Sequence, residues 1–181
     1  MRLFIFLLLS TTVFLSCTDD DTETPSVEVT DLEIVTGVVL TDANGQGNGS
    51  VGNPNWYNGL ILYPNPPQDV QTAALQSGEE ITEVYVIPAA KNTDFTSAEV
   101  MDAMENFDGY TAAELQTNAV VTSSQEPSVT QFQYRLDGLN PGYYRVIVTD
   151  VLGIQHGSNI FIDSTLSYPS GLTDFLISDW Q

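Results

Sequence analysis

Carboxylates are the only abundant reactive side chains in this sequence of 181 residues. The chain has 24 Asp and Glu, four Lys and Arg, one His and one Cys. Two carboxylates at a defined separation, one with a raised pKa, can hydrolyse a glycosidic bond, but no particular pair can be named among so many acidic residues. His156 has no second histidine, nucleophile motif or metal-ligand spacing beside it, so we expect it in a turn. We expect a non-catalytic protein and keep a secreted, carboxylate-dependent glycoside hydrolase as an alternative.

Asp42 and Asn44 are the candidate metal ligands. They begin an Asn- and Gly-rich stretch, residues 42–49, in which oxygen-bearing side chains alternate before a glycine, as at the start of a calcium-binding loop. The bidentate Glu that completes such a loop is absent, and position 53 is Asn. Because Asn and Gly accept left-handed backbone, the stretch is typical of a long hairpin turn. We therefore expect a turn first and a Ca²⁺ site second, with no other cofactor.

Three aromatic residues are the candidate ligand contacts. Trp56 and Tyr57 lie in a loop rich in Asn, Pro and Gly, and Tyr63 ends the apolar run that follows. Such a pair either packs over the end of a β-sandwich as a plug or forms a platform on which a sugar ring stacks. We expect the plug, and we name Trp56, Tyr57 and Tyr63 as the contact residues for the case that the ligand is a sugar.

The charge of the chain limits its partners. The formal net charge is -20. An excess of acidic residues of this size argues against nucleic acid as a partner and against direct adsorption on an anionic membrane surface. With Cys17 as the single cysteine, neither an intrachain disulfide nor a cysteine-based zinc site can form.

The N-terminal residues have the layout of an export signal. Met1 and Arg2 precede an apolar run over residues 3–9, and the small residue Ser16 precedes Cys17. The run is too short to span a bilayer, which favours a signal peptide over residues 1–16. The segment resembles the lipobox of bacterial lipoproteins, in which the cysteine after the cleavage point is acylated. The resemblance implies that Cys17 is lipidated and attaches the protein to a membrane, because several acyl chains anchor a protein stably.

An acidic stretch, residues 17–26, follows the cysteine. It contains three consecutive Asp residues and no apolar residue before Val27, so it cannot fold alone and is expected to be a disordered tether. An acidic run at this place also resembles the signal that sends certain Gram-negative lipoproteins to the outer face of the outer membrane. The resemblance implies a lipid-anchored protein that faces the cell exterior.

The remaining residues predict one β-rich domain, residues 27–165, and a C-terminal tail, residues 166–181, that packs on it as a helix or an extra strand. Alternation of apolar residues predicts strands within residues 27–40 and at residues 60–63, 70–75, 81–87, 119–122 and 160–162. Thr96 and Glu99 form a capping box before apolar residues at helical spacing, and Thr111 and Glu114 repeat the box. We expect one or two short helices there, and the strand at 81–87 is expected to end at Pro88.

Residues 132–150 are the clearest strand signal. Phe132, Tyr134 and Leu136 form one apolar face, and Tyr144 begins a second run in which β-branched and aromatic residues occupy both faces. Gly and Pro residues between the two runs favour a tight reversal. We expect the two runs to pair antiparallel and the second to be a central strand.

Several motifs together resemble bacterial fibronectin type III domains. They are VYVIPAA (84–90), TSAEVMDAM (96–104), AVV (119–121) and FQYRLDGLNPGYYRVIVTDVLG (132–153). In that family a strand is followed by a short helix, and a Leu-x-Pro-Gly turn leads into a strand bearing a tyrosine; here Leu139, Pro141, Gly142 and Tyr144 match. The resemblance implies an all-β fold, an antiparallel Ig-like or fibronectin type III-like sandwich with one or two short helices inserted.

These observations predict a lipid-anchored, surface-exposed, non-catalytic binding or accessory protein. Its partner would be a glycan, another cell surface or a protein of an outer-membrane complex. A structural subunit of a membrane complex is the alternative to a binding protein.

Overall fold

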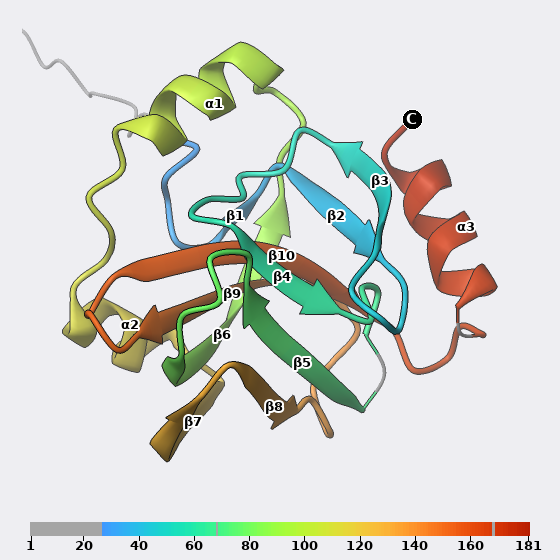
Figure 1. Ribbon diagram of the computed structural model, residues 1–181. Coiled ribbons are helices and arrows are strands. Elements are labelled where there is room, and N and C mark those ends of the chain that lie inside the picture. The colour runs from blue at the N-terminus through green and yellow to red at the C-terminus, as the bar shows by residue number, and fades with distance from the viewer. Residues whose placement is uncertain (1–26, 68, 168) are drawn as a thin grey trace, which may run out of the picture.

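The computed structural model describes residues 27–67, 69–167 and 169–181 (Figure 1). The signal peptide, Cys17 and the tether expected within residues 1–26 lie outside the described residues. Among the described residues strands far outnumber helices, and the helices are short, so the predicted all-β fold with inserted helices is confirmed. The strands are β1 Ile34–Val35, β2 Gly37–Thr41, β3 Gly47–Gly52, β4 Leu60–Tyr63, β5 Val70–Leu75, β6 Ile81–Lys91, β7 Val121–Val129, β8 Gln131–Arg135, β9 Gly142–Asp150 and β10 Gln155–Ile162; the helices are α1 Ser97–Glu105, α2 Ala112–Asn118 and α3 Ser170–Asp179.

Strands β4 to β10 form a sandwich of two antiparallel sheets. One sheet has the order β4-β5-β8, and the other has the order β7-β6-β9-β10, with the short β1 added parallel to the end of β6. The inward side chains of both sheets form the main core, which includes Leu62, Phe132 and Val146. The chain crosses between the sheets from β5 to β6 and from β8 to β9, as it does in Ig-like sandwiches.

The prediction that the two runs within residues 132–150 pair as a hairpin is wrong. β8 pairs with β5, whereas β9 lies between β6 and β10 as a central strand. The two strands face each other across the core, because Phe132 and Tyr134 of β8 and Val146 of β9 enter the same apolar cluster from opposite sheets. The connection is fixed at the start of β9, where the Tyr144 hydroxyl donates to the Asn140 carbonyl oxygen at 2.7 Å. This arrangement is the tyrosine corner of sandwich folds.

The sheet containing β9 is buried on both faces. Tyr144, Val146 and Val148 point into the main core, while Tyr143 and Ile147 point the other way and are covered as well. Parts of the chain outside the sandwich supply this cover (Figure 1). Aromatic and β-branched residues on both faces of β9 are therefore required by packing, as they are in any strand without a solvent face.

Two separate groups of elements cover the outer face of this sheet. The β2–β3 hairpin and α3 bury Val38, Leu172 and Leu176 against it, so the C-terminal tail is a helix. Around Tyr57 and Ile147, Leu115 of α2 closes a third apolar cluster, with Phe107 packed at its border. Both α1 and α2 begin at the predicted capping boxes, Thr96 with Glu99 and Thr111 with Glu114.

Strand β6 does not end at Pro88 but continues to Lys91. One edge of β6 faces both β7 and β1. At this edge the Val86 carbonyl oxygen accepts from the Val120 N–H, and the Ala90 N–H donates to the Glu33 carbonyl oxygen. Pro88 has the same orientation by alternation and lies in the gap between β7 and β1. No ladder bond needs its missing N–H, which is the condition under which a strand tolerates proline.

The tyrosine corner can be tested by the substitution Tyr144→Phe. Removing the hydroxyl leaves the Asn140 carbonyl without this donor, so the free energy of unfolding should fall by about 1 kcal/mol. Urea denaturation followed by tryptophan fluorescence measures the change. Tyr63→Phe is the matched control, because the Tyr63 hydroxyl makes no hydrogen bond with the described residues; an equal loss in both variants would contradict the corner.

Candidate functional site

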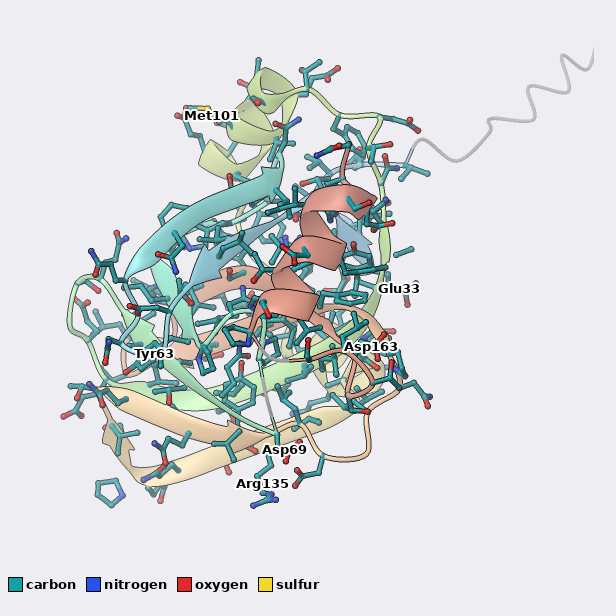
Figure 2. All side chains as sticks on the ribbon, turned by 90° about the vertical axis from the view of Figure 1, so that its right-hand side faces the viewer. Glu33, Tyr63, Asp69, Met101, Arg135 and Asp163 are labelled. Carbon is teal, nitrogen blue, oxygen red and sulfur yellow. The ribbon has the colours of Figure 1, made fainter. Side chains whose placement is uncertain are left out.

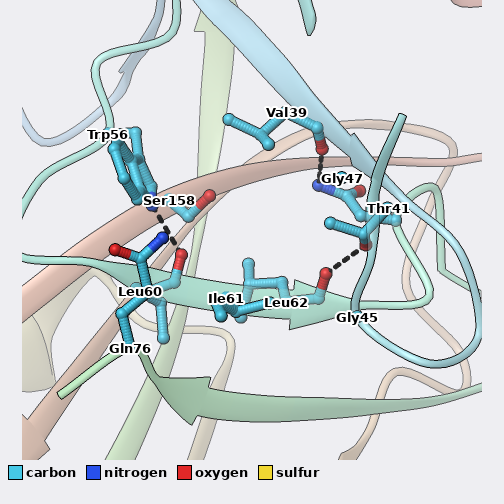
Figure 3. Close-up of a pocket in the computed structure, with 11 residues that line it drawn as sticks. Val39, Thr41, Gly45, Gly47, Trp56, Leu60, Ile61, Leu62, Gln76 and Ser158 are labelled. Carbon is cyan, nitrogen blue, oxygen red and sulfur yellow. Dashed lines mark hydrogen bonds between the residues drawn. The ribbon is translucent and has the colours of Figure 1, made fainter. Parts of the chain in front are cut away.

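The candidate site lies along the free edge of β4. Leu60 and Leu62 point their backbone groups away from β5, toward the β2–β3 hairpin. Side chains satisfy both carbonyl oxygens: the Trp56 indole Nε1 donates to Leu60 at 2.5 Å, and the Thr41 hydroxyl donates to Leu62 at 2.5 Å (Figure 3). The edge is therefore covered by side chains and not by another strand, and the Trp56 ring is held in one orientation.

A cavity of about 170 Å³, which we call the Trp56 cavity, opens between the hairpin and β4 (Figure 3). Its walls are mostly apolar, with a few polar side chains among them. The lining residues include Val39, Trp56, Leu60, Ile61, Gln76 and Ser158. Its volume is close to the roughly 150 Å³ of an apolar cavity that holds benzene. The cavity can therefore take one small group and not a whole oligosaccharide.

Asn65 lines this cavity and has one hydrogen-bond acceptor without a partner among the described residues. The residue is 1% exposed, and its Nδ2 donates to the carbonyl oxygens of Val39 at 2.7 Å and Asn159 at 2.9 Å. Its Oδ1 is buried and has no partner among the described residues. A buried acceptor without a donor costs free energy, which a bound donor would recover. The sequence analysis did not select Asn65, because its partners lie far away along the chain.

The rim of the cavity is formed by the turn between β2 and β3. Gly45 adopts φ 79°, and a side chain there would approach the Tyr63 ring to 3.2 Å, so the turn needs glycine at this point. Asp42 and Asn44 lie in the same turn. The Asp42 Oδ1 accepts from the backbone N–H groups of Gln46 and Asn44 at 2.9 and 2.8 Å, and these bonds lower the pKa of Asp42.

The predicted hairpin turn is thus confirmed, but it covers residues 42–46 and not 42–49, because Gly47 already begins β3; the Asp42 carboxylate closes the turn. Within residues 27–67, 69–167 and 169–181 no group of three or more His, Cys, Asp or Glu side chains is arranged to hold a metal ion. The calcium site at Asp42 and Asn44 stays a prediction.

Trp56, Tyr57 and Tyr63 do not form one platform. Trp56 lines the cavity, whereas Tyr57 pairs through its backbone with Gly157 of β10 and points its ring to the other side, where it is 6% exposed. That ring packs edge-on against Phe107, with 5.3 Å between the ring centres, so Tyr57 is a buried packing residue; it covers the outer face of the β6–β9–β10 sheet and not the end of the sandwich. Tyr63 lies on the outer face of the β4-β5-β8 sheet, in line with Gln133 on β8, and is partly exposed (Figure 2).

Tyr57 also covers a buried positive charge. Arg145 of β9 is fully buried, and its guanidinium lies 5.7 Å from the ring centres of both Tyr57 and Tyr110. One nitrogen, Nη1, donates to the Ile34 carbonyl at 3.3 Å, while Nε and Nη2 have no partner among the described residues. Burial raises the pKa of the Tyr57 phenol far above its ordinary value, although Arg145 opposes the shift. The two rings stabilise Arg145 by cation–π attraction.

His156 is not an exposed turn residue but a buried residue of β10. Its Nε2 lies 3.0 Å from Asp150 Oδ2, and its Nδ1 lies 2.6 Å from the Asn58 carbonyl oxygen. The Asp150 Oδ1 accepts from the N–H groups of Leu152 and Ile154 at 2.8 and 2.9 Å. Burial raises the pKa of Asp150, but the hydrogen bonds from His156, Ile154 and Leu152 outweigh it and hold the pKa below its ordinary value of 3.8.

No sequence signal paired His156 with Asp150 in advance. An Asp at the end of a strand, with Gly153 three residues later, is nevertheless typical of a side chain that closes a turn onto backbone N–H groups. That pattern places Asp150 at the base of the loop between β9 and β10. His156 is opposite Val148, which points into the main core, so His156 lies on the same inward face and near Asp150.

Asp150 makes the stability of the fold depend on acid pH. Because its pKa is lower in the folded than in the unfolded chain, its ionised form stabilises the fold above about pH 4, and this contribution is lost as the pH falls through the folded pKa. At pH 7 the substitution Asp150→Asn should lower the free energy of unfolding by about 1–3 kcal/mol. Between pH 4 and pH 2 the wild type should lose stability more steeply than the variant.

Urea unfolding at a series of pH values measures both effects. Asp137→Asn is the matched control, because the Asp137 carboxylate is exposed and its ion pair with Arg135 lies at the surface. The control should follow the wild type at every pH. A wild type and Asp150→Asn variant with parallel pH profiles would contradict the assignment.

Among the described residues, no helix is long and apolar enough to cross a membrane. Comparisons of the chain with models of known families, with curated proteins and with solved structures gave no significant match. The resemblances to bacterial lipoproteins and to fibronectin type III domains therefore stay predictions, and the function has to be argued from the site itself.

Proposed function

We propose that the protein is a lipid-anchored, surface-exposed, non-catalytic protein that binds a neutral glycan through the Trp56 cavity. The observation that carries the proposal is a fixed indole beside a small, mostly apolar cavity, which is also lined by Asn65, whose buried Oδ1 has no partner among the described residues. Sugar-binding sites combine an aromatic face with a few polar groups, because a pyranose ring has apolar C–H faces and a hydroxyl rim.

The size and polarity of the cavity favour one substituent of a sugar. An N-acetyl group has a methyl that suits the apolar walls formed by Val39 and Ile61, and an amide N–H that can donate to Asn65 Oδ1. The sugar ring would then lie against Trp56 at the mouth. An unacetylated sugar would leave the buried acceptor unpaired, so selectivity for the N-acetyl group follows from the same atoms.

The charge of the described residues favours an uncharged ligand. Arg2 lies outside them, which leaves three basic side chains. Lys91 pairs with Asp179 at 3.0 Å, Arg145 is buried, and Arg135 pairs with Asp137 on the surface. Uronic acids and sulfated sugars would meet an acidic surface without a free cation to bind them. Neutral, N-acetylated glycans are the ligand class that remains compatible with both the cavity and the surface.

The outer face of the β4-β5-β8 sheet offers contacts to the rest of a glycan chain. Ile61 lines the cavity and shares its outward orientation on β4 with Tyr63, which is in register with Thr72 of β5 and Gln133 of β8. An aromatic ring beside an exposed amide can bind a second sugar unit. This face lies on the sheet that has no further layer outside it.

Binding should depend on the Trp56 ring. Trp56→Ala is expected to weaken binding of an N-acetylglucosamine trisaccharide about five- to thirtyfold, because stacking on an aromatic ring contributes about 1–2 kcal/mol. Isothermal titration calorimetry with this trisaccharide and with the β-1,4-linked glucose trisaccharide, which is also neutral but has no acetamido groups, measures affinity and selectivity. Val70→Ala, on the same face but away from the cavity, is the matched control and should bind like the wild type.

The proposal would fail if the wild type bound neither sugar, or if Trp56→Ala bound as tightly as the wild type. Because Trp56 also caps the edge of β4, thermal unfolding of the variant must be compared with that of Val70→Ala. Lost binding in a variant that unfolds at the wild-type temperature assigns the effect to the cavity.

The anchor is tested separately at Cys17. In the full-length chain, Cys17→Ala should move the protein from the membrane fraction to the soluble fraction, because the thiol that would carry the acyl chains is gone. Fractionation of cells, followed by detection of the protein in each fraction, measures the change. A variant that still sediments with membranes would contradict lipid anchoring and leave the glycan proposal untouched.

A further inference from the structure

The loop between β9 and β10 carries an exposed aliphatic tip. Val151, Leu152 and Ile154 are 48%, 72% and 48% exposed, with Gly153 between them. Leu152 is the most exposed large apolar side chain among the described residues. Three aliphatic side chains crowded on one turn form an apolar patch, which soluble proteins avoid unless it contacts something.

The tip is rigid because its backbone is tied to the core. Asp150 accepts from the N–H groups of Leu152 and Ile154, and its second oxygen pairs with the buried His156. Two backbone hydrogen bonds close the loop as well, from the Asp150 N–H to the Ile154 carbonyl oxygen at 3.0 Å and from the Gly153 N–H to the Asp150 carbonyl oxygen at 3.1 Å. The inward polar groups are therefore satisfied, and the aliphatic side chains are held outward. A docking element ordered in this way loses little conformational entropy on binding.

Two exposed acidic residues, Glu80 and Asp108, lie on segments next to the loop, and we call them the acidic collar. The Glu80 carbonyl oxygen accepts from the Val151 N–H, and the Glu80 carboxylate accepts from the Ser128 hydroxyl. On another side, Asp108 precedes Gly109, which packs against Gln155 at the start of β10. The exposed cation Arg135 ends β8, before the crossing to the start of β9, and so lies at the opposite end of the sandwich from this loop.

We propose that the tip formed by residues 151–154 docks into an apolar pocket, rimmed by basic side chains, on a partner protein. An anionic membrane surface would repel the acidic surroundings of the tip. A second copy of this chain has no free basic rim to offer, since Lys91 and Arg135 are paired and Arg145 is buried. A partner protein with an apolar pocket and a basic rim would bury the aliphatic side chains of the tip and attract the acidic residues beside it. The residues differ from those of the Trp56 cavity, so this inference stands or falls independently of glycan binding.

The test uses the full-length chain in its own cells. The photoreactive residue p-benzoylphenylalanine replaces Leu152 or, as a control of similar exposure on α1, Met101 at 63%. We expect a crosslinked protein at position 152 that is absent at position 101. The crosslinked peptide should come from an apolar pocket bordered by Lys or Arg.

The identified partner is then purified and its affinity measured with the unlabelled chain. Leu152→Asp should weaken binding at least tenfold, because it places a charge in an apolar pocket, whereas Met101→Asp should change it less than twofold. Raising the salt concentration should weaken binding, because it screens the basic rim from the acidic collar. Both substitutions are on the surface, so neither should shift the thermal unfolding.

Three results would overturn the proposal. The first is equal crosslinking, or none, at positions 152 and 101. The second is sedimentation with phosphatidylcholine vesicles that Leu152→Asp abolishes, which would assign the tip to a lipid surface. The third is concentration-dependent dimerisation that Leu152→Asp abolishes, which would assign it to a second copy of the chain.

Discussion

The structure depends on one constraint: the β6–β9–β10 sheet has apolar side chains on both faces, so both faces must be covered. The β4-β5-β8 sheet covers one face and forms the main core. The other face is covered by segments far apart in the sequence, the β2–β3 hairpin with α3 in one place and Tyr57 with α2 in another. Because the hairpin has to lie over this sheet, its turn also passes beside the free edge of β4, and the Trp56 cavity forms where the two meet.

The sequence predicted which residues form strands better than it predicted which strands are neighbours. Alternation identified β5 and the inward face of β8, because a period of two fixes which side chains point to an apolar core, while β-branched and aromatic residues on both faces identified β9 as a central strand. The same alternation fits a hairpin and a pair of strands facing each other across a core, so the pairing of β8 with β9 was wrongly expected. The predicted end of a strand at Pro88 is wrong for a similar reason. Whether a strand tolerates proline depends on which strands pair with its edge, and here β1 and β7 leave a gap at Pro88.

The candidate site was predictable only in part. An aromatic residue in a polar loop is visible in the sequence, and Trp56 was selected on that basis, but its neighbour Tyr57 has the same signature and a different place in the fold. Asn65 acquires its importance from Val39 and Asn159, which approach it only after the hairpin and β10 are in position. Contacts of this kind are set by the tertiary arrangement, and no local pattern of residue types encodes them.

The N-terminal end of the described chain is fastened to the sandwich by a few bonds, and these bonds decide how the fold would respond to a pull from that side. The first are two side-chain bonds, from Asn55 Nδ2 to the Val29 carbonyl oxygen at 3.1 Å and from the Tyr110 hydroxyl to the Thr30 carbonyl oxygen at 2.8 Å. The short strand β1 follows, parallel to the end of β6, with bonds from the Ala90 N–H to Glu33 at 2.7 Å and from the Asn92 N–H to Val35 at 2.9 Å. Tension would load these bonds before the longer strands, and because Val35 is fully buried, separating β1 from β6 would open the apolar cluster under α3.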